Sequence, residues 1–249
     1  MEHPGFSRIV LPNGLTILLQ KEDRKSMSFG IGVRFGSAHH GAAHAVEHGL
    51  LKGTRTKTDL DILRIAVRHG GDWDGFVGFF STFFITKNIA SYGYEALELL
   101  CDRVANSTFP EAEIARERKR VLSEHMTRSQ EPERILMDRI YRTLYCDTPL
   151  ERAVIDDKKL LQNISRDDLF SLYKTYYVPS QLIIVGVGDI DKEKVKDIVT
   201  KYFPQTEKVR VPSLEIPLDA SQPPSGKIII PEGYKNDEVH LMVGFKTVP

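Results

Sequence analysis

The chain has 249 residues, in which 34 Lys and Arg balance 34 Asp and Glu, and hydrophobic residues make up 41%. This composition is typical of a soluble globular protein, and the lack of a basic excess argues against nucleic acid as a partner. No apolar run approaches the roughly 18 residues that a membrane span needs, so we expect no membrane partner.

The first residues show neither a signal peptide nor an Arg-rich presequence, and the two cysteines, Cys101 and Cys146, make no disulfide framework. Both cysteines fall in predicted helices, where we expect them to pack in the interior. The sequence therefore predicts a cytoplasmic protein.

Apolar periodicity and turn residues predict an alternation of hairpins and helix pairs. The chain opens with a hairpin, in which Arg8–Leu11 and Leu15–Gln20 flank an Asn13-Gly14 turn. Further strands are predicted at Ser26–Phe35, Phe76–Phe80, Thr82–Thr86 and Leu182–Val187. Helices are predicted at Ala42–Leu51, Asp59–His69, Tyr94–Ala105, Glu111–Ser129, Pro132–Tyr145, Arg166–Tyr177 and Asp191–Phe203. This order favours the α+β class, with a mostly antiparallel sheet packed with helices.

The composition changes after Phe203. Residues 205–226 hold four of the 13 prolines and show no helical period, which is typical of a linker. Two short strands follow, at Lys227–Pro231 and Glu238–Phe245. The sequence thus predicts one domain over residues 1–204, a linker over 205–226 and the start of a second, incomplete domain over 227–249.

The motif with most chemical content is His44-Ala45-Val46-Glu47-His48. On a helix, His44 and His48 lie one turn apart on the same face, where two imidazoles can hold one zinc ion. Glu47 lies on nearly the same side and can act as a general base without being a ligand. The alternative is a surface helix that carries histidines by chance.

A catalytic zinc takes three protein ligands and keeps one position open, so a third ligand is needed from another element. The helix over Glu111–Ser129 offers Glu113, Glu117 and Glu124. The last two are seven residues apart and therefore face the same way. Spacing alone leaves a solvated charged face equally plausible, because lysine and arginine residues adjoin these acids.

These residues resemble the M16 family of metallopeptidases (pitrilysin, insulinase and the processing peptidases), whose signature is H-x-x-E-H. Leu11–Leu15 is similar to the family's opening L-x-N-G-L, and Lys52-Gly53-Thr54 to its F-K-G-T. Glu117–Glu124 is similar to its E-R-x-x-V-L-x-E helix, with the last Glu 76 positions after His48. Leu182–Asp189 resembles the strand that closes the family's N-terminal half.

The resemblance covers about Phe6–Phe203 and implies the N-terminal half of a LuxS/processing-peptidase-like metallohydrolase. It implies that His44, His48 and Glu124 bind one Zn²⁺ per chain, and that Glu47 is the general base for a zinc-bound water. Glu117 is implied as a second carboxylate that orients the site or aids proton traffic. The function implied is that of a zinc-dependent endopeptidase acting on peptides or short unfolded segments.

The family binds substrate by β-strand addition at a G-G-x-x-N-A-x-T segment, which corresponds to Gly70–Val77. Asp74 stands where Asn is usual and Gly75 where Ala is usual, and both are candidate substrate-binding residues. A carboxylate at Asp74 either repels acidic groups or favours basic peptides. We expect the aromatic residues between Trp73 and Phe84 to form sheet core.

The loop before the motif is shorter than is usual in the family and contains His39 and His40, which are alternative metal ligands or, as we expect, ordinary loop histidines. Family members usually carry two homologous halves, and this chain resembles one of them. Three explanations are open: a piece of a longer chain, which we favour, a homodimer, or a subunit with a separate second M16-type half. The alternative function is accordingly a non-catalytic or partner-dependent subunit.

Overall fold

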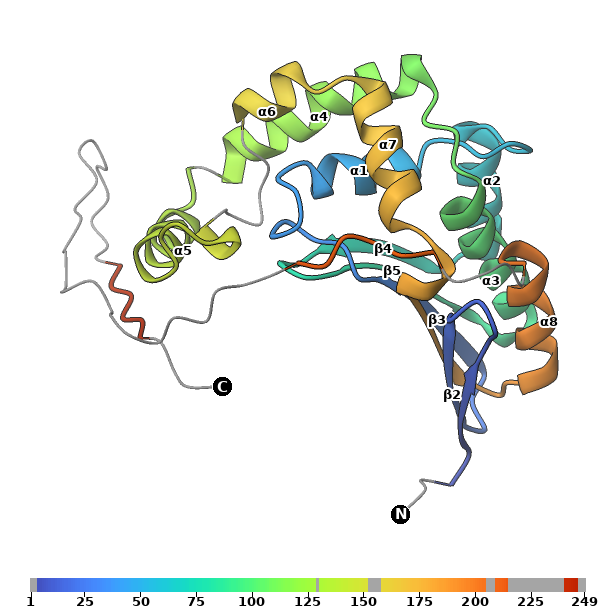
Figure 1. Ribbon diagram of the computed structural model, residues 1–249. Coiled ribbons are helices and arrows are strands. Elements are labelled where there is room, and N and C mark those ends of the chain that lie inside the picture. Colours follow the sequence, from blue (N-terminus) through green and yellow to red (C-terminus); the bar gives the residue numbers. More distant parts are fainter. Residues whose placement is uncertain (1–3, 129, 152–157, 205–208, 215–239, 246–249) are drawn as a thin grey trace.

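The structure, a computed structural model, describes residues 4–128, 130–151, 158–204, 209–214 and 240–245. Its described part is one six-stranded sheet with helices packed on it (Figure 1). The strands are β1 (Phe6–Val10), β2 (Thr16–Lys21), β3 (Ser26–Val33), β4 (Asp72–Val77), β5 (Thr82–Ile89) and β6 (Leu182–Gly188).

The α-helices are α1 (Ala43–Leu50), α2 (Asp59–His69), α3 (Ala90–Asn106), α4 (Glu111–Arg128), α5 (Pro132–Leu144), α6 (Lys158–Asn163), α7 (Arg166–Tyr176) and α8 (Lys192–Tyr202). Two short 3-10 helices lie at η1 (Pro149–Glu151) and η2 (Pro179–Gln181). In the part of the chain that the structure describes, no helix has the length and apolar character needed to cross a bilayer.

The sheet has the strand order β1-β2-β6-β3-β5-β4. Of the described pairs, β2 with β6 is parallel and the others are antiparallel, so the predicted α+β class and mostly antiparallel sheet are confirmed. One face is buried under helices that include α1 and α3, and its side chains include Leu19, Phe29, Phe84 and Ile184. The opposite face carries exposed apolar side chains, among them Phe76, Ile85 and Val185.

The first hairpin forms where it was predicted, because its turn residues supply both the backbone conformation and the hydrogen bonds of the turn. Gly14 adopts a positive φ of 90°, which costs glycine little. The Asn13 side chain is buried, accepts from the Leu15 backbone N–H, and donates to the carbonyl oxygens of Phe203 and Pro204. Asn13 therefore fixes the turn and also ties the start of the sheet to the end of α8.

Two helices begin with capping boxes that the sequence contains in full. Thr58 and Asp61 bond reciprocally at the start of α2, and Ser165 and Asp168 do so at the start of α7. Gly70 ends α2 in the left-handed conformation with φ 61°. Because caps of this kind depend on a few adjacent residues, these helix ends agree with the prediction.

Some predictions were wrong. The fourth strand was predicted at Phe76–Phe80, whereas β4 begins at Asp72 and ends at Val77, because Gly78 and Ser81 already close the turn to β5. Helix α6 was not predicted. Residues 240–245 have no strand, contrary to the strand predicted at Glu238–Phe245.

The other C-terminal predictions are only partly covered by the structure. The strand predicted at Lys227–Pro231 lies outside the described residues, and residues 209–214 have no regular secondary structure. The domain boundaries at residues 204 and 226 stay predictions.

Candidate metal centre

The HxxEH segment forms α1, a short helix held between the sheet and α4. Its apolar residues are buried, as is Glu47, while His44 and His48 are partly exposed. A Cβ atom added at Gly49 would lie 2.6 Å from Phe109 Cε1 and 2.9 Å from Ile114 Cδ1. The missing side chain at Gly49 therefore lets α1 approach α4 closely enough for glutamates of α4 to reach its histidines.

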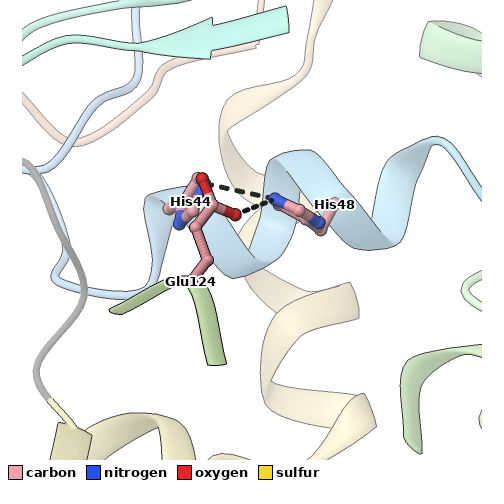
Figure 2. Close-up of side chains that lie close together, drawn as sticks. All are labelled: His44, His48 and Glu124. Atoms are coloured by element: carbon pink, nitrogen blue, oxygen red, sulfur yellow. Dashed lines mark hydrogen bonds and ion pairs between the residues drawn. The ribbon is translucent and has the colours of Figure 1, made fainter. Parts of the chain in front are cut away.

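His44, His48 and Glu124 converge from these two helices (Figure 2). The Nε2 atoms of the two histidines lie 3.2 Å apart, and His48 Nε2 lies 3.6 Å from Glu124 Oε2. Each of the three residues offers one ligand atom, and these three atoms lie within 4.8 Å of one another. Two imidazoles and a carboxylate are a donor set that zinc accepts, so the chemistry of these three residues fits the ion.

Glu117 lies behind His48, on the side away from the other two residues. Its Oε2 is 2.8 Å from His48 Nδ1, and its Oε1 is 3.0 Å from Lys52 Nζ. With the proton on Nδ1 donated to Glu117, His48 keeps the Nε2 lone pair for a ligand. Burial raises the pKa of Glu117, but the hydrogen bonds from His48 and Lys52 outweigh it and hold the pKa below its ordinary value.

Glu47 has a different environment from Glu117, although both are carboxylates of one site. Its side chain is 5% exposed, and its Oε2 lies 3.7 Å from His48 Nε2. Burial raises the pKa of Glu47, while the positive fields of His48, His44 and Arg103 oppose the rise. Glu47 is thus a buried carboxylate beside the metal-binding trio and not a member of it, which is the position that a proton acceptor needs.

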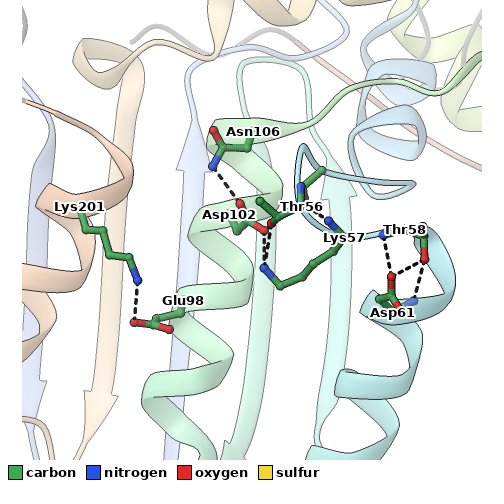
Figure 3. Close-up of polar contacts among 9 residues, drawn as sticks. Thr56, Lys57, Thr58, Asp61, Glu98, Asp102, Asn106 and Lys201 are labelled. Atoms are coloured by element: carbon green, nitrogen blue, oxygen red, sulfur yellow. Dashed lines mark hydrogen bonds and ion pairs between the residues drawn. The ribbon is translucent and has the colours of Figure 1, made fainter.

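The Lys52-Gly53-Thr54 segment connects this centre to the rest of the fold. Lys52 contacts Glu117, and Thr54 Oγ1 donates to Asp102 Oδ2 of α3 at 3.0 Å. Asp102, 2% exposed, also accepts from Lys57 Nζ at 2.9 Å and Asn106 Nδ2 at 2.8 Å (Figure 3). This buried cluster fixes the loop after α1 and therefore the position of Lys52.

A cleft of about 460 Å³ opens between α1, α4 and strand β4. Among the described strands, β4 pairs with β5 alone, so its other edge is open. Gly78 N–H donates to Ser81 O, and the register pairs Val77 with Thr82. Hydrogen-bonded and non-hydrogen-bonded pairs alternate along an antiparallel ladder, so Gly75 and Phe84 form a non-hydrogen-bonded pair. The backbone N–H and C=O of Gly75 therefore point away from β5, towards the open edge.

Gly75 and Asp74 lie in β4 beside the trio but face opposite ways. A Cβ atom on Gly75 would lie 2.4 Å from Glu47 Oε1, so Gly75 is directly against Glu47. Successive side chains of a strand point to opposite faces, which places Asp74 on the far face. Its carboxylate returns to the strand edge and accepts from the Gly75 N–H at 2.9 Å.

The remaining candidates lie elsewhere or behave differently. His39 Nδ1 accepts from the Gly36 N–H, and neither His39 nor His40 joins the described metal-binding group. Cys101 is buried as expected, but Cys146 is exposed, because it follows the end of α5. The expectation that the aromatic residues form core holds for Phe84, which is 1% exposed, and is wrong for Phe76 and Phe80.

The basic residues of the cleft were not predicted from the sequence, Lys52 and Arg103 among them. Lys52 was noted only as part of a motif, although its ammonium contacts Glu117. Arg103 was not noted at all, although it is 9% exposed and lines the cleft. A signal existed, since Arg103 lies on the same side of α3 as Leu99 and Leu100, on an otherwise apolar stripe.

Similarity to known proteins identifies the family of the chain. The model of the insulinase family, peptidase family M16, matches residues 16–158. The chain belongs to this family. A second model, described as the peptidase M16 inactive domain, matches residues 163–249.

Its relatives include processing peptidases and zinc proteases. The chain is 29% identical over 221 residues to a probable mitochondrial-processing peptidase subunit beta of Arabidopsis thaliana, covering 86% of this chain and 41% of that protein. It is 28% identical over 248 residues to an uncharacterized zinc protease of Bacillus subtilis, covering 97% of this chain and 59% of that protein. The chain thus spans about half the length of these M16 relatives.

Solved structures show the same fold. A protease from Helicobacter pylori superposes with a TM-score of 0.77 at 24% identity, over 86% of this chain and 53% of that one. A putative M16-like peptidase from Alicyclobacillus acidocaldarius gives a TM-score of 0.76 at 19% identity, over 87% and 54%. At these identities the likeness concerns the fold alone.

Proposed function

We propose that this M16 chain is the metal-binding half of a zinc-dependent endopeptidase that hydrolyses peptides or short unfolded segments. The observation that carries the proposal is the meeting of His44, His48 and Glu124 at one point, with the buried carboxylate of Glu47 beside it. Relatives named as zinc proteases support the choice of metal and reaction.

In this proposal His44, His48 and Glu124 hold one Zn²⁺. When bound, the ion supplies Lewis acidity, which acidifies water and polarises a peptide carbonyl. Glu47 takes the proton of the attacking water and delivers it to the leaving amine, a role that its burial and its place beside the metal-binding trio favour. Glu117 orients His48 through the hydrogen bond at Nδ1.

The substrate is proposed to bind as an added strand on the open edge of β4, where Asp74 and Gly75 lie. Gly75 brings the added backbone close to Glu47, since no side chain separates them. The Gly75 N–H that such a strand needs is bonded to the Asp74 carboxylate, so binding displaces that carboxylate. Asp74 is therefore a candidate for selecting among peptides at this edge.

The test compares Glu47→Gln and Glu124→Gln with the unmodified chain, and uses Glu113→Gln as a matched control. Glu113 lies on α4, pairs with Arg116 and does not line the cleft. We expect Glu47→Gln to keep its zinc and to lose hydrolysis of an unstructured peptide by about 10²- to 10⁴-fold. We expect Glu124→Gln to lose zinc affinity, and the control to match the unmodified chain. A Glu47→Gln chain with bound zinc and full activity would show that the base is another group.

The alternative is a non-catalytic or partner-dependent subunit, which relatives named as subunits of the mitochondrial-processing peptidase support. Its proposed partner is a second M16-type half, or a second copy of this chain. Mass in solution and zinc content, measured on the same sample, separate the two functions: a zinc-loaded monomer without peptidase activity favours the subunit.

For location we propose the cytoplasm, because both cysteines are free thiols. Fractionation of the source cells tests this assignment, and recovery of the protein outside the cytoplasm contradicts it.

A further inference from the structure

Arg103 is a buried cation in the wall of the cleft; its positive field acts on Glu47, but it forms no ion pair with that carboxylate among the described residues and is not part of the metal-binding group. It lies in the last turn of α3 and is 9% exposed. Its guanidinium lies over the ring of Trp73 of β4, with 5.8 Å between the guanidinium carbon and the ring centroid. Both side chains line the same cleft as His44 and Glu47.

Each of these two residues has a buried N–H donor without an acceptor. Arg103 Nε and Trp73 Nε1 are both inaccessible to solvent and have no hydrogen-bond partner among the described residues. No carboxylate oxygen of the described chain lies within 4.0 Å of the Arg103 nitrogens, although Glu47 and Asp59 act on it at longer range. Burial lowers the pKa of Arg103 to about 10, which still leaves it charged at neutral pH.

Such a group is costly to bury. A buried charge normally has a hydrogen-bonded partner of opposite sign, and unsatisfied buried donors are rare. An acceptor with negative charge would compensate the guanidinium, and a carboxylate matches its planar fork. The open side from which such a group can arrive is the cleft.

The charges that line the cleft also favour a negatively charged ligand. Five basic side chains line it, against four acidic ones. The basic residues are Lys52, Arg103, Arg120, Arg128 and Arg134. Lys52 and Arg128 are already paired with Glu117 and Glu124, whereas Arg120, like Arg103, has no ion pair in the described chain. Trp73 and Gly75 are two residues apart in β4 and face the same side of the sheet, so a strand added at this edge can direct one side chain inward past Gly75.

We propose that Arg103, together with the Trp73 N–H, binds a carboxylate of the substrate and makes the cleft selective for it. The carboxylate is that of an internal Asp or Glu side chain or of the peptide C-terminus. This inference rests on the proposed function only in assuming that a peptide enters the cleft. Arg103 is a specificity-determining residue here, and it acts on binding whether or not the peptide is cleaved.

Trp73 supplies the binding signal, because it is the only tryptophan of the chain. The binding experiment titrates zinc-loaded Glu47→Gln protein with tryptophan-free peptides and follows the fluorescence of Trp73. The peptides form pairs that differ only in Glu against Gln at one position, scanned along the peptide, or in a free against an amidated C-terminus. The second arm measures kcat/KM of the unmodified chain for the same pairs.

We expect one Glu/Gln position, or the free C-terminus, to bind about 10- to 100-fold more tightly than its neutral partner, the range for a hydrogen bond to a charged group. Arg103→Gln should remove this preference, and Arg103→Lys should keep part of it. The pair that shows the preference distinguishes a side-chain carboxylate from a terminal one.

The peptide pairs make the proposal testable even if the Arg103 variants fail to fold. Equal affinities within every pair on the Glu47→Gln protein, or no binding at millimolar peptide, would overturn it. A preference in binding without hydrolysis by the unmodified chain contradicts the peptidase proposal and leaves this one standing. Hydrolysis without any carboxylate preference supports the peptidase proposal and contradicts the role of Arg103.

Discussion

Removing the Asp102 carboxylate should destabilise the fold more than removing any surface carboxylate of α3. Asp102 is 2% exposed and accepts hydrogen bonds from Thr54, Lys57 and Asn106 at 2.8 to 3.0 Å. Asp102→Ala leaves the Lys57 ammonium without its partner and removes acceptors from two further donors. Because the Lys57 side chain is 29% exposed, the loss should be smaller than for a fully buried charge pair, about 2–3 kcal/mol of unfolding free energy.

The matched control is Glu98→Ala on the same helix. Glu98 pairs with Lys201 at 3.4 Å (Figure 3), but the Lys201 side chain is 61% exposed and that of Glu98 42%. Solvent-exposed pairs of this kind contribute little, so we expect hardly any change in this variant. Urea unfolding followed by circular dichroism measures both variants at pH 7. Equal small losses for the two variants would refute the assigned importance of the buried cluster.

The effect of Asp102 should also depend on pH in a defined direction. Burial alone raises the pKa of Asp102, but hydrogen bonds from Lys57, Asn106 and Thr54 outweigh it and lower the pKa below its ordinary value. A lowered folded-state pKa means that the carboxylate stabilises the fold above the unfolded value of about 3.9 and loses this effect as the pH falls through the folded value. The difference between the unmodified chain and Asp102→Asn should therefore shrink below about pH 4, and a difference that grows there contradicts the sign.

Three other substitutions test the contacts around the site. Glu117→Gln should lower zinc affinity about 10- to 100-fold in competition with a chromophoric chelator, because the carboxylate orients His48, and Glu113→Gln should not. Asn13→Ala should lower the free energy of unfolding in urea by about 1–3 kcal/mol, since two backbone carbonyls lose their donor. An unchanged urea midpoint would contradict this role of Asn13. Gly49→Val should cost about 1–3 kcal/mol and weaken zinc binding, because its side chain drives α1 away from α4; unchanged zinc affinity with a stable fold would contradict this.

The local elements followed from short stretches of sequence. The Asn13-Gly14 turn, the capping box of Thr58 and Asp61, and the left-handed Gly70 depend on neighbours within a few residues, so their positions could be predicted. The turn spacing of His44 and His48 likewise put both imidazoles on one helix face before any tertiary structure was considered.

The start of β4 could not be predicted in this way. Its residues Asp72, Asp74 and Gly75 are poor strand formers, and pairing with β5 overrides that preference. The exposure of Phe76 and Phe80 was missed for a related reason, because alternation alone does not say which face of a sheet the helices cover.

The sequence by itself determined the ligand types, the helix that carries the two histidines and the family to which they belong. Tertiary packing decided which α4 carboxylate meets the histidines at Nε2 and which bonds His48 at Nδ1. It also decided that Arg103, 55 positions after His48, lines the same cleft. Such contacts depend on how closely helices and strands approach one another. That distance depends on side-chain volumes at positions far apart in the sequence, such as Gly49 and Gly75.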